Sequence, residues 1–439
     1  MTIPRPADFL ISRLEPCQFL SPLGERGQPF VEDTDRTLVS TNLRDLQSSL
    51  TTGQPPPTFE VAGPRKHLFF DPRTITCGIV TCGGLCPGVN DVIRSVALTL
   101  RYAYSVQHIL GFRYGYAGLS AKSGHAPLEL TPDVVDNIHE QGGTLLGSSR
   151  GPQELDDMIN TLVQHKVSIL FAIGGDGTLR GASALSRVLR QRRLPICIIG
   201  IPKTIDNDLD WIERSFGFAT AVEEATKAIA AAHNEARGAW NGIGLVKLMG
   251  RHSGFIAAHA TLANSNVNFC LVPEVAFSLG GEKGFLQTLE RRLDSRQHAV
   301  IVVAEGAGQD LLQGPMQQQR DASGNVRLQD IGVFLRDEIT RYFADKKKEL
   351  TIKYIDPSYM IRSLPAYAID SEFCLLLGQH AVHAGMAGRT DMVVGYWTQH
   401  FTHVPIALTV AHRKQLDPQG AVWQSVLQAT GQPSAMLEE

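Results

Sequence analysis

The sequence lacks several features that would define its class at once. No apolar run approaches the roughly 18 residues of a membrane-spanning helix. The first residues, MTIPRPADFLISRLEP, have neither a basic head followed by a long apolar stretch nor a cleavage signature. Basic residues are not in excess either: Lys plus Arg number 41 against 44 for Asp plus Glu, so no global positive field favours nucleic acid. We therefore expect a cytoplasmic protein that binds neither membrane nor nucleic acid.

Cysteine is sparse, and its placement argues against disulfides and against a cysteine-bound metal. The chain has seven cysteines, an odd number, and Cys77, Cys82, Cys197 and Cys270 lie within or beside apolar runs. These positions favour small buried hydrophobic side chains over disulfide bonds. Cys82 and Cys86 flank a glycine loop, but no histidine or further cysteine follows at ligand spacing, so we reject a metal site there.

A chain of 439 residues is long enough for two domains. Residues 1–70 differ from the rest and form an expected N-terminal extension, which packs on the body or on a neighbouring subunit. Within it, residues 51–66 are rich in proline and glycine, so we expect no regular helix or central strand there. From residue 71 onward strand-like runs alternate with helix-like runs, which predicts parallel sheets covered on both faces. Residues 313–330 are polar and turn-rich and are expected to form a mobile surface excursion.

The first candidate site is the glycine loop TCGGLCPGVN at residues 81–90. The β-branched run ITCGIV at 75–80 precedes it and predicts a buried parallel strand. Gly83, Gly84 and Gly88 allow a tight turn and a close approach of the backbone to a ligand. The helix-like run that begins near Asn90 would place free N–H groups beside this turn. That arrangement is typical of a phosphate site.

The second loop, at residues 174–178, repeats the design. It follows the strand-like run SILFAI at 168–173 and opens another helix-like run, LRGASALSRVLRQ. Its residues are Gly174, Gly175, Asp176, Gly177 and Thr178. A carboxylate inside a phosphate loop repels the ligand unless a cation lies between them, so Asp176 predicts Mg²⁺.

The third segment, IPKTIDND at residues 201–208, supplies groups for chemistry. It ends the buried run PICIIGI at 195–201. In an extended segment Asp206 and Asp208 would share one side, so that one accepts a proton from an attacking hydroxyl while the other holds a metal or an arginine. Lys203 would place a cation against the transferring group. Each residue alone suits a solvated turn as well. Three such segments after three consecutive strands favour a phosphoryl-transfer site, because ligands bind beyond the carboxyl ends of strands in open α/β sheets.

Further strands are predicted at 243–248, 269–274, 299–306 and 392–397, and further motifs accompany them. They are GFRYGYAGL, GGTLLGSSRG, GFATA, KLMGRHSGFIA, PEVAF, AEGAG and YIDPSYMIRS. Taken in order with GGLCPGVNDVIR, GGDGTLRGA and PKTIDND, these motifs make the chain resemble the 6-phosphofructokinases. The resemblance is to their long branch, which is related to pyrophosphate-dependent enzymes and to the ATP-dependent enzymes of plants and protists, and it runs from about residue 71 to about residue 397.

The resemblance implies an α/β fold of two doubly wound, Rossmann-like lobes with mainly parallel sheets. A phosphoryl-donor lobe would comprise 71–217 and 362–412, and a sugar-phosphate lobe 218–361 and 413–439. The implied reaction moves the γ-phosphoryl group of ATP to the 1-hydroxyl of fructose 6-phosphate with Mg²⁺, in a homo-oligomer (dimer or tetramer).

The resemblance also assigns roles to residues. Those implied for the donor and its Mg²⁺ are Gly83, Tyr116, Arg150, Gly174, Gly175, Asp176, Gly177, Thr178 and Gly181, with Asp176 on the metal. Asp206 falls in the place of the general base, and Arg251 and Lys203 complete the catalytic set. Those implied for the sugar phosphate are Thr204, Asp208, Met249, Gly250, Arg251, Glu305, Lys353, Tyr359 and Arg362, with Lys353 crossing a subunit interface. The shorter bacterial enzymes differ by a histidine at the position of Tyr359 and a basic residue at that of Gly242.

The phosphoryl donor is left open between ATP and pyrophosphate. In the resembled family ATP users have glycine at the position of Gly177, where pyrophosphate users have an aspartate that fills the space of the α-phosphate and repels it. Lys203 is shared with the pyrophosphate users, but plant and protist ATP enzymes combine glycine and lysine as this chain does. ATP is therefore favoured. Lipid and NAD kinases share GGDGT but lack PKTIDND followed by MGR, and a non-catalytic sensor is disfavoured because Asp206 and Asp176 are both present.

Overall fold

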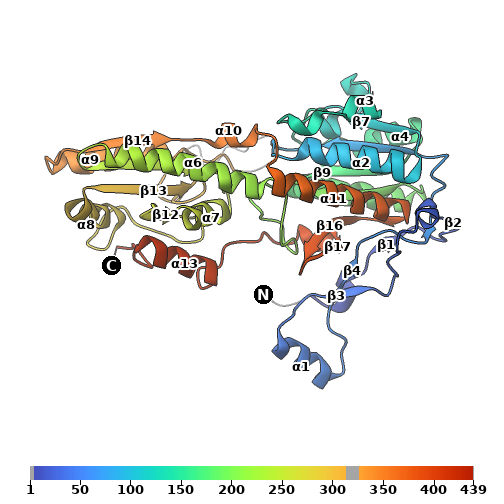
Figure 1. Ribbon diagram of the computed structural model, residues 1–439, viewed down its shortest axis with the longest axis horizontal. Helices are drawn as coiled ribbons and strands as arrows, with labels where there is room; N and C mark the ends of the chain where they lie inside the picture. Colours follow the sequence, from blue (N-terminus) through green and yellow to red (C-terminus); the bar gives the residue numbers. More distant parts are fainter. Residues whose placement is uncertain (1–3, 313–325, 439) are drawn as a thin grey trace. The chain divides into compact units, whose positions relative to one another are not determined.

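A computed structural model of the protein describes residues 4–312 and 326–438. The chain divides into two compact units, one of Met1–Gly217 with Leu364–Arg413 and one of Phe218–Ser363 with Lys414–Glu439 (Figure 1). Most of the segment 313–330, for which a mobile excursion was expected, lies outside the described residues. Among those described, no helix has both the length and the apolar character that crossing a membrane requires.

The first unit is built on a nine-stranded sheet. In sheet order its strands are β3 (Arg36–Leu38), β4 (Thr58–Val61), β17 (His400–Pro405), β16 (Met392–Trp397), β10 (Cys197–Pro202), β9 (Val167–Gly174), β6 (Thr76–Thr81), β7 (His108–Phe112) and β8 (Leu128–Glu129). The pairs from β16 to β7 are parallel, and the outer pairs are antiparallel. The β-branched runs predicted as buried strands therefore form the parallel centre.

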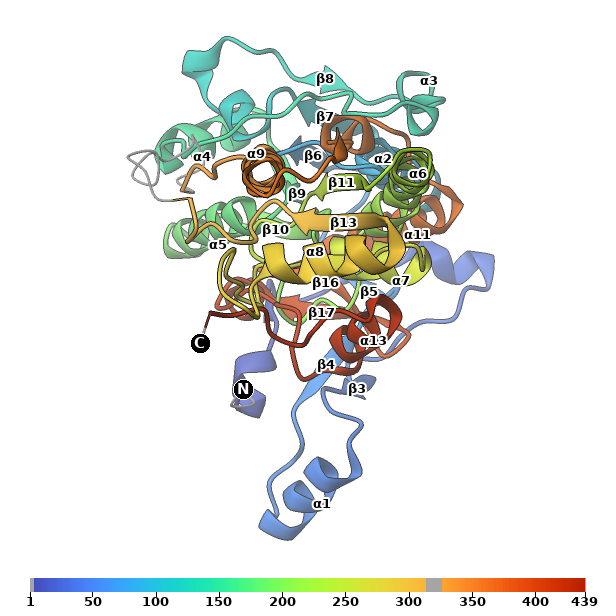
Figure 2. The same ribbon diagram turned by 90° about the vertical axis from the view of Figure 1, so that its left-hand side faces the viewer.

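Helices cover both faces of this sheet, as Figure 2 shows. One face carries α2 (Val89–Tyr104) and α11 (Ala368–Met386), and the other carries α4 (Leu155–Gln164), α5 (Asp176–Gln191) and the short α12 (Ile406–Thr409). The short α3 (Pro132–Val135) packs against α2. Apolar side chains of α4 and α5 form a core with inward-facing residues of the central strands, among them Val80, Leu170 and Ile198. This is the doubly wound arrangement that the sequence predicted.

The second unit has a four-stranded, fully parallel sheet in the order β12-β13-β11-β14. Its elements are α6 (Phe218–Arg237), β11 (Gly242–Leu248), α7 (Phe255–Ala263), β12 (Phe269–Leu271), α8 (Phe285–Arg296), β13 (His298–Ala304), α9 (Ile331–Asp345), β14 (Thr351–Ile355), α10 (Ser358–Arg362) and α13 (Ala421–Thr430). Ile243 and Leu245 on one side of β11 join the core with α8 and α9. On the other side α6 approaches so closely that a Cβ at Gly244 would lie 2.6 Å from the carbonyl oxygen of Ala232. The predicted α/β fold class is therefore confirmed for this unit as well.

The expectation that residues 51–66 hold no regular helix or central strand was wrong. Helix α1 (Leu43–Thr52) ends inside this segment, and β4 pairs with β3 on one side and β17 on the other. The reason is the position of the prolines. Pro55, Pro56 and Pro57 all precede β4 and Pro64 follows it, so the strand keeps every N–H group that its ladders require.

The extension is also joined to the unit by short ladders and by a buried ionic cluster. β1 (Ser12–Arg13) pairs with β15 (Arg389–Thr390), and β2 (Phe19–Leu20) with β5 (His67–Leu68). The buried Glu60 carboxylate accepts from Arg13, Arg65 and Arg389 at 2.8, 3.1 and 3.0 Å, and lies 3.0 Å from Nδ1 of His403. Burial by itself would raise the pKa of Glu60, but the His403 hydrogen bond and the neighbouring positive charges lower this pKa well below its usual value.

Candidate active site

The three segments predicted to handle phosphate lie side by side because β6, β9 and β10 are neighbouring parallel strands. The backbone joins them: the N–H of Cys82 donates to the Ile173 carbonyl at 2.9 Å, and the N–H of Lys203 donates to the Gly174 carbonyl at 2.9 Å. The Lys203 ammonium then reaches back to the Gly84 carbonyl at 2.5 Å. Lys203 is 7% exposed. In this structure its charge holds the first loop to the third segment.

Glycine is required at specific points of the first two loops. Gly83 and Gly88 adopt φ values of +87° and +97°, and a Cβ at Gly88 would lie 2.6 Å from the Cys374 sulfur. In the second loop a Cβ at Gly174 would come within 2.2 Å of the Thr178 hydroxyl oxygen. Both loops therefore turn sharply into the N-termini of α2 and α5, where unpaired N–H groups favour an anion.

Gly177 differs from these glycines because it faces open space. It is the second residue of α5 and is exposed, and a Cβ built on it meets no atom within 4 Å. Its φ is not positive. The fold therefore does not demand glycine here.

Tyr116 and Gly181 lie behind the second loop. Tyr116 is buried, and its hydroxyl donates to the Thr178 carbonyl at 2.7 Å. A Cβ at Gly181 would lie 2.9 Å from the Tyr116 ring. Both residues thus help to fix the start of α5. Arg150 is exposed, with its guanidinium 3.5 Å from where a Gly84 Cβ would stand.

The third segment is a turn, so the extended geometry expected for Asp206 and Asp208 was wrong. Ile205 and Asp206 form the turn, and Asn207 adopts a φ of +54°. The Asn207 side chain donates to the Glu213 carbonyl at 3.2 Å and accepts from the Ser215 N–H at 3.0 Å. Asparagine tolerates this left-handed conformation better than most residues. Its side chain sets the directions in which Asp206 and Asp208 leave the backbone.

Two arginines that the sequence did not point to, Arg413 and Arg180, form ion pairs with the carboxylates of Asp176 and Asp208. Arg413 lies 3.0 Å from Asp208 and 3.4 Å from Asp176, and so bridges the third segment and the second loop. Arg180, one turn along α5, donates to the other oxygen of Asp176 at 2.9 Å. Asp208 also accepts from the Thr204 hydroxyl at 2.6 Å. Arg413 belongs to no recognisable motif and is 237 residues from Asp176 in the chain, so no pattern in the sequence indicates this contact. Arg180 is only four residues after Asp176 on a predicted helix, and that spacing could have revealed the ion pair.

Asp176 fits Mg²⁺ only in combination with ligands from the donor. Among the described residues, no group of three or more His, Cys, Asp or Glu side chains is arranged to hold a metal ion. Mg²⁺ is commonly bound by one or two carboxylates together with substrate phosphates and waters. The half-buried Asp176 could supply this one carboxylate if the 3.4 Å ion pair with Arg413, the longer of its two ion pairs, were broken.

The second unit brings together most of the residues predicted for the sugar phosphate. Met249, Gly250 and Arg251 follow β11 and Glu305 follows β13, and these two strands are parallel neighbours. The Glu305 N–H donates to the Leu248 carbonyl at 2.9 Å. Gly250 has a φ of +125°, and a Cβ there would lie 2.5 Å from the Ser253 carbonyl oxygen. The close turn after β11 therefore requires glycine.

Arg362 joins this group, but Lys353 and Tyr359 do not. The Arg362 guanidinium lies 3.2 Å from the Met249 sulfur, so α10 is held beside the end of β11. Tyr359 on the same helix is 81% exposed. Lys353 projects outward from β14, 4.0 Å from Glu235 on the surface. The half-buried Arg251 donates to the Val326 carbonyl.

Comparisons with known proteins agree on one family. The sequence model of the family described as Phosphofructokinase matches residues 76–385. A protein of Borreliella burgdorferi named ATP-dependent 6-phosphofructokinase is 46% identical, with 98% of each chain covered. One of the same name from Amycolatopsis methanolica is 48% identical, covering 97% of this chain and 95% of that one. Among solved structures, a pyrophosphate-dependent phosphofructokinase from Marinobacter aquaeolei has a TM-score of 0.67 at 20% identity, covering 81% of this chain and 91% of that one.

Proposed function

This chain belongs to the phosphofructokinase family, and we propose that it transfers the γ-phosphoryl group of ATP to the 1-hydroxyl of D-fructose 6-phosphate. The observation that carries this proposal is the similarity over almost the whole chain to relatives named ATP-dependent 6-phosphofructokinase. Two glycine loops that open helices, followed by a carboxylate-rich turn, supply the groups that phosphoryl transfer requires.

In the first unit, the N–H groups at the starts of α2 and α5 cradle the donor phosphates, and the exposed Arg150 supplies a guanidinium to them. Asp176 would hold Mg²⁺ together with the phosphates. The metal would neutralise charge on the transferring group. Asp206 takes the proton of the 1-hydroxyl as the new bond forms. Lys203 acts mainly by holding the first loop against this turn, because its ammonium already contacts the Gly84 carbonyl.

In the second unit, Arg362 binds the 6-phosphate, and Gly250, Arg251 and Glu305 surround the sugar at the ends of β11 and β13. Support comes from the glycine turn and from the contact between Arg362 and Met249, which gather these groups at one edge of the sheet. Thr204 and Asp208 contact the sugar from the third segment. Lys353 and Tyr359 are exposed in this chain. We propose that they act in a homo-oligomer, where Lys353 serves the site of a neighbouring subunit.

ATP is the proposed donor, and pyrophosphate is the second candidate. The open space at Gly177 leaves room for an α-phosphate. Lys203, the residue shared with pyrophosphate users, is buried and bonded to the backbone of the first loop, which is a role that either donor permits. Pyrophosphate is the second candidate donor because the fold is similar to that of a pyrophosphate-dependent phosphofructokinase.

One assay tests the proposal. The purified protein receives fructose 6-phosphate and Mg²⁺ with either ATP or pyrophosphate, and fructose 1,6-bisphosphate is measured. We expect turnover with ATP and little or none with pyrophosphate. Turnover with pyrophosphate alone would overturn the donor assignment, and saturable binding of both substrates without product would identify a sensor subunit instead.

A further inference from the structure

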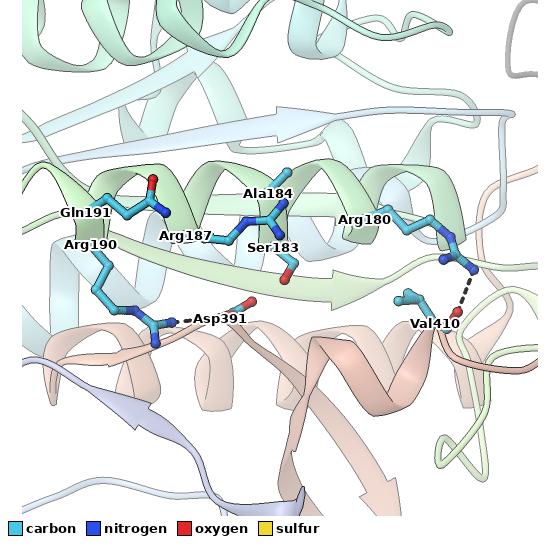
Figure 3. Close-up of a pocket in the computed structure, with 8 residues that line it drawn as sticks. All are labelled: Arg180, Ser183, Ala184, Arg187, Arg190, Gln191, Asp391 and Val410. Carbon is cyan, nitrogen blue, oxygen red and sulfur yellow. Dashed lines mark hydrogen bonds and ion pairs between the residues drawn. The ribbon is translucent and has the colours of Figure 1, made fainter.

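A hollow of about 690 Å³ lies along one side of α5, within the first unit. Figure 3 shows its arrangement: Arg190 reaches Asp391 at one end, Arg180 reaches Val410 at the other, and Arg187 and Ser183 lie between them. Volumes of roughly 300–1,000 Å³ are typical of small-molecule sites. Nothing in the proposed phosphoryl transfer uses this hollow.

Helix geometry separates the hollow from the glycine loop. Arg180, Ser183, Arg187 and Arg190 are three or four residues apart, so they share one face of α5. Gly181 packs against the Tyr116 ring instead. The N-terminus of α5 therefore belongs to the donor loop, while one side of the helix faces the hollow. Arg180 stands at the boundary, because it lines the hollow and also pairs with Asp176.

The charges in the hollow are incompletely paired. Arg180 donates to Asp176 at 2.9 Å and to the Val410 carbonyl. Arg190 lies 3.4 Å from Asp391. Within residues 4–312 and 326–438, Arg187 has no ion pair or hydrogen bond, and Arg190, with the same charge, is three residues away on the same helix, where like charges repel. An anion beside Arg187 would relieve that repulsion.

The lining indicates the chemical class of this anion. Three arginines and one aspartate, Asp391, line the hollow. Arg180 is paired with Asp176 and Arg190 with Asp391, so one positive charge, that of Arg187, is left without a counter-charge. A phosphate monoester carries about −1.5 to −2 charges at neutral pH, and guanidinium groups bind its oxygens in a forked geometry. Ser183 and Gln191 add a hydroxyl and an amide that can hydrogen bond to a polar ligand. We propose that this hollow binds a small, hydroxylated phosphate ester, with the phosphate on Arg187 and Arg190 and the polar body beside Ser183 and Gln191.

Calorimetric titration with ribose 5-phosphate tests the proposal, and ribose serves as the probe without phosphate. The key variant is Arg187→Gln, which removes the charge from an exposed helical position and keeps a good helix former. Arg193→Gln is the matched control, because Arg193 is exposed just beyond α5 and does not line the hollow. Arg362→Ala removes the proposed substrate-phosphate contact and so distinguishes the two sites.

We expect ribose 5-phosphate to bind and ribose not to bind. Arg187→Gln should raise the dissociation constant at the hollow by at least about tenfold, as expected for loss of a hydrogen bond to a charged group. Arg193→Gln and Arg362→Ala should leave this constant unchanged. An unchanged constant in Arg187→Gln, or binding that disappears only in Arg362→Ala, would overturn the proposal. The turnover assay with fructose 6-phosphate is read separately, so failure of the proposed function would show there and not in this titration.

Discussion

Gly177→Asp is the substitution that tests the proposed donor most directly. A side chain at this position enters open space, since no atom lies within 4 Å of its Cβ, and the backbone has an ordinary negative φ. It is also the second residue of α5. A carboxylate in the first turn of a helix typically stabilises the helix by about 0.3–1 kcal/mol. The variant should therefore fold at least as stably as the parent protein.

The expected loss of activity comes from charge. Two unit charges about 4 Å apart near a protein surface repel each other by about 4 kcal/mol, which corresponds to roughly a thousandfold lower kcat/KM. At twice this separation the repulsion is halved and the loss is roughly thirtyfold. The introduced carboxylate would act on the α-phosphate of ATP, a group that pyrophosphate lacks. The loss should therefore appear with ATP and spare any activity with pyrophosphate.

The assay is the ATP dependence of turnover at saturating fructose 6-phosphate, with Gly177→Asn as the control of equal size and no charge. We expect Gly177→Asn to lose much less activity than Gly177→Asp, and both to unfold at the same denaturant concentration as the parent or higher. Equal losses would show that the space is needed and the charge irrelevant. A Gly177→Asp protein with unchanged kcat/KM for ATP would show that this loop does not hold the α-phosphate.

Three further outcomes are expected. Asp206→Asn should lower turnover by about 10²–10⁴-fold, the usual contribution of a positioned base, while the binding of both substrates, measured by calorimetry, is preserved. Extra Mg²⁺ should restore part of the activity of Asp176→Asn and none of the activity of Asp206→Asn. Arg362→Ala should weaken fructose 6-phosphate binding by about 1.5–3 kcal/mol and leave the KM for ATP unchanged, and equal weakening of both substrates would indicate a structural role. Burial lowers the pKa of His383 to about 3, so the unfolded chain takes up a proton that the folded protein refuses as the pH falls below the usual value. Between pH 7 and pH 5 this should remove about 2 kcal/mol of unfolding free energy. Burial also lowers the pKa of His380, to about 4, so urea titrations of His383→Gln should show a smaller loss than the parent protein and not its absence.

The parallel centre of the first unit was predictable because its signals are local. Two of the central strands, β6 and β9, are short apolar runs followed closely by glycines and then by helical periodicity, in α2 and α5. The edge of the same sheet was not predictable in this way. β4 exists because it pairs with β17, more than 300 residues away, and because Glu60 gathers arginines and a histidine from four separate segments. The local sequence shows the prolines around β4, but it does not show that the strand pairs with β17 or that Glu60 meets the arginines and His403.

The candidate site shows the same division between local and distant information. Motifs located Asp176, Lys203 and the glycine turns at strand ends, where the structure has them. They did not reveal that the buried Tyr116 donates to the Thr178 carbonyl, and its contact with the donor stays a prediction. The cytoplasmic location, the role of Mg²⁺ and the homo-oligomer expected from the sequence stay predictions.

Arg413 shows why the charge balance at this site could not be read from motifs. The carboxylates of Asp176 and Asp208 belong to different loops, and each repels a phosphate that enters between them. Arg413 pairs with both and is itself held by a bridge to Leu209, so the chain after α12 supplies the cation that lets two acidic loops lie together. When a donor brings Mg²⁺ to Asp176, we expect the 3.4 Å contact with Arg413 to break before the 3.0 Å contact with Asp208. Arg413 would then remain paired with Asp208 on the third segment.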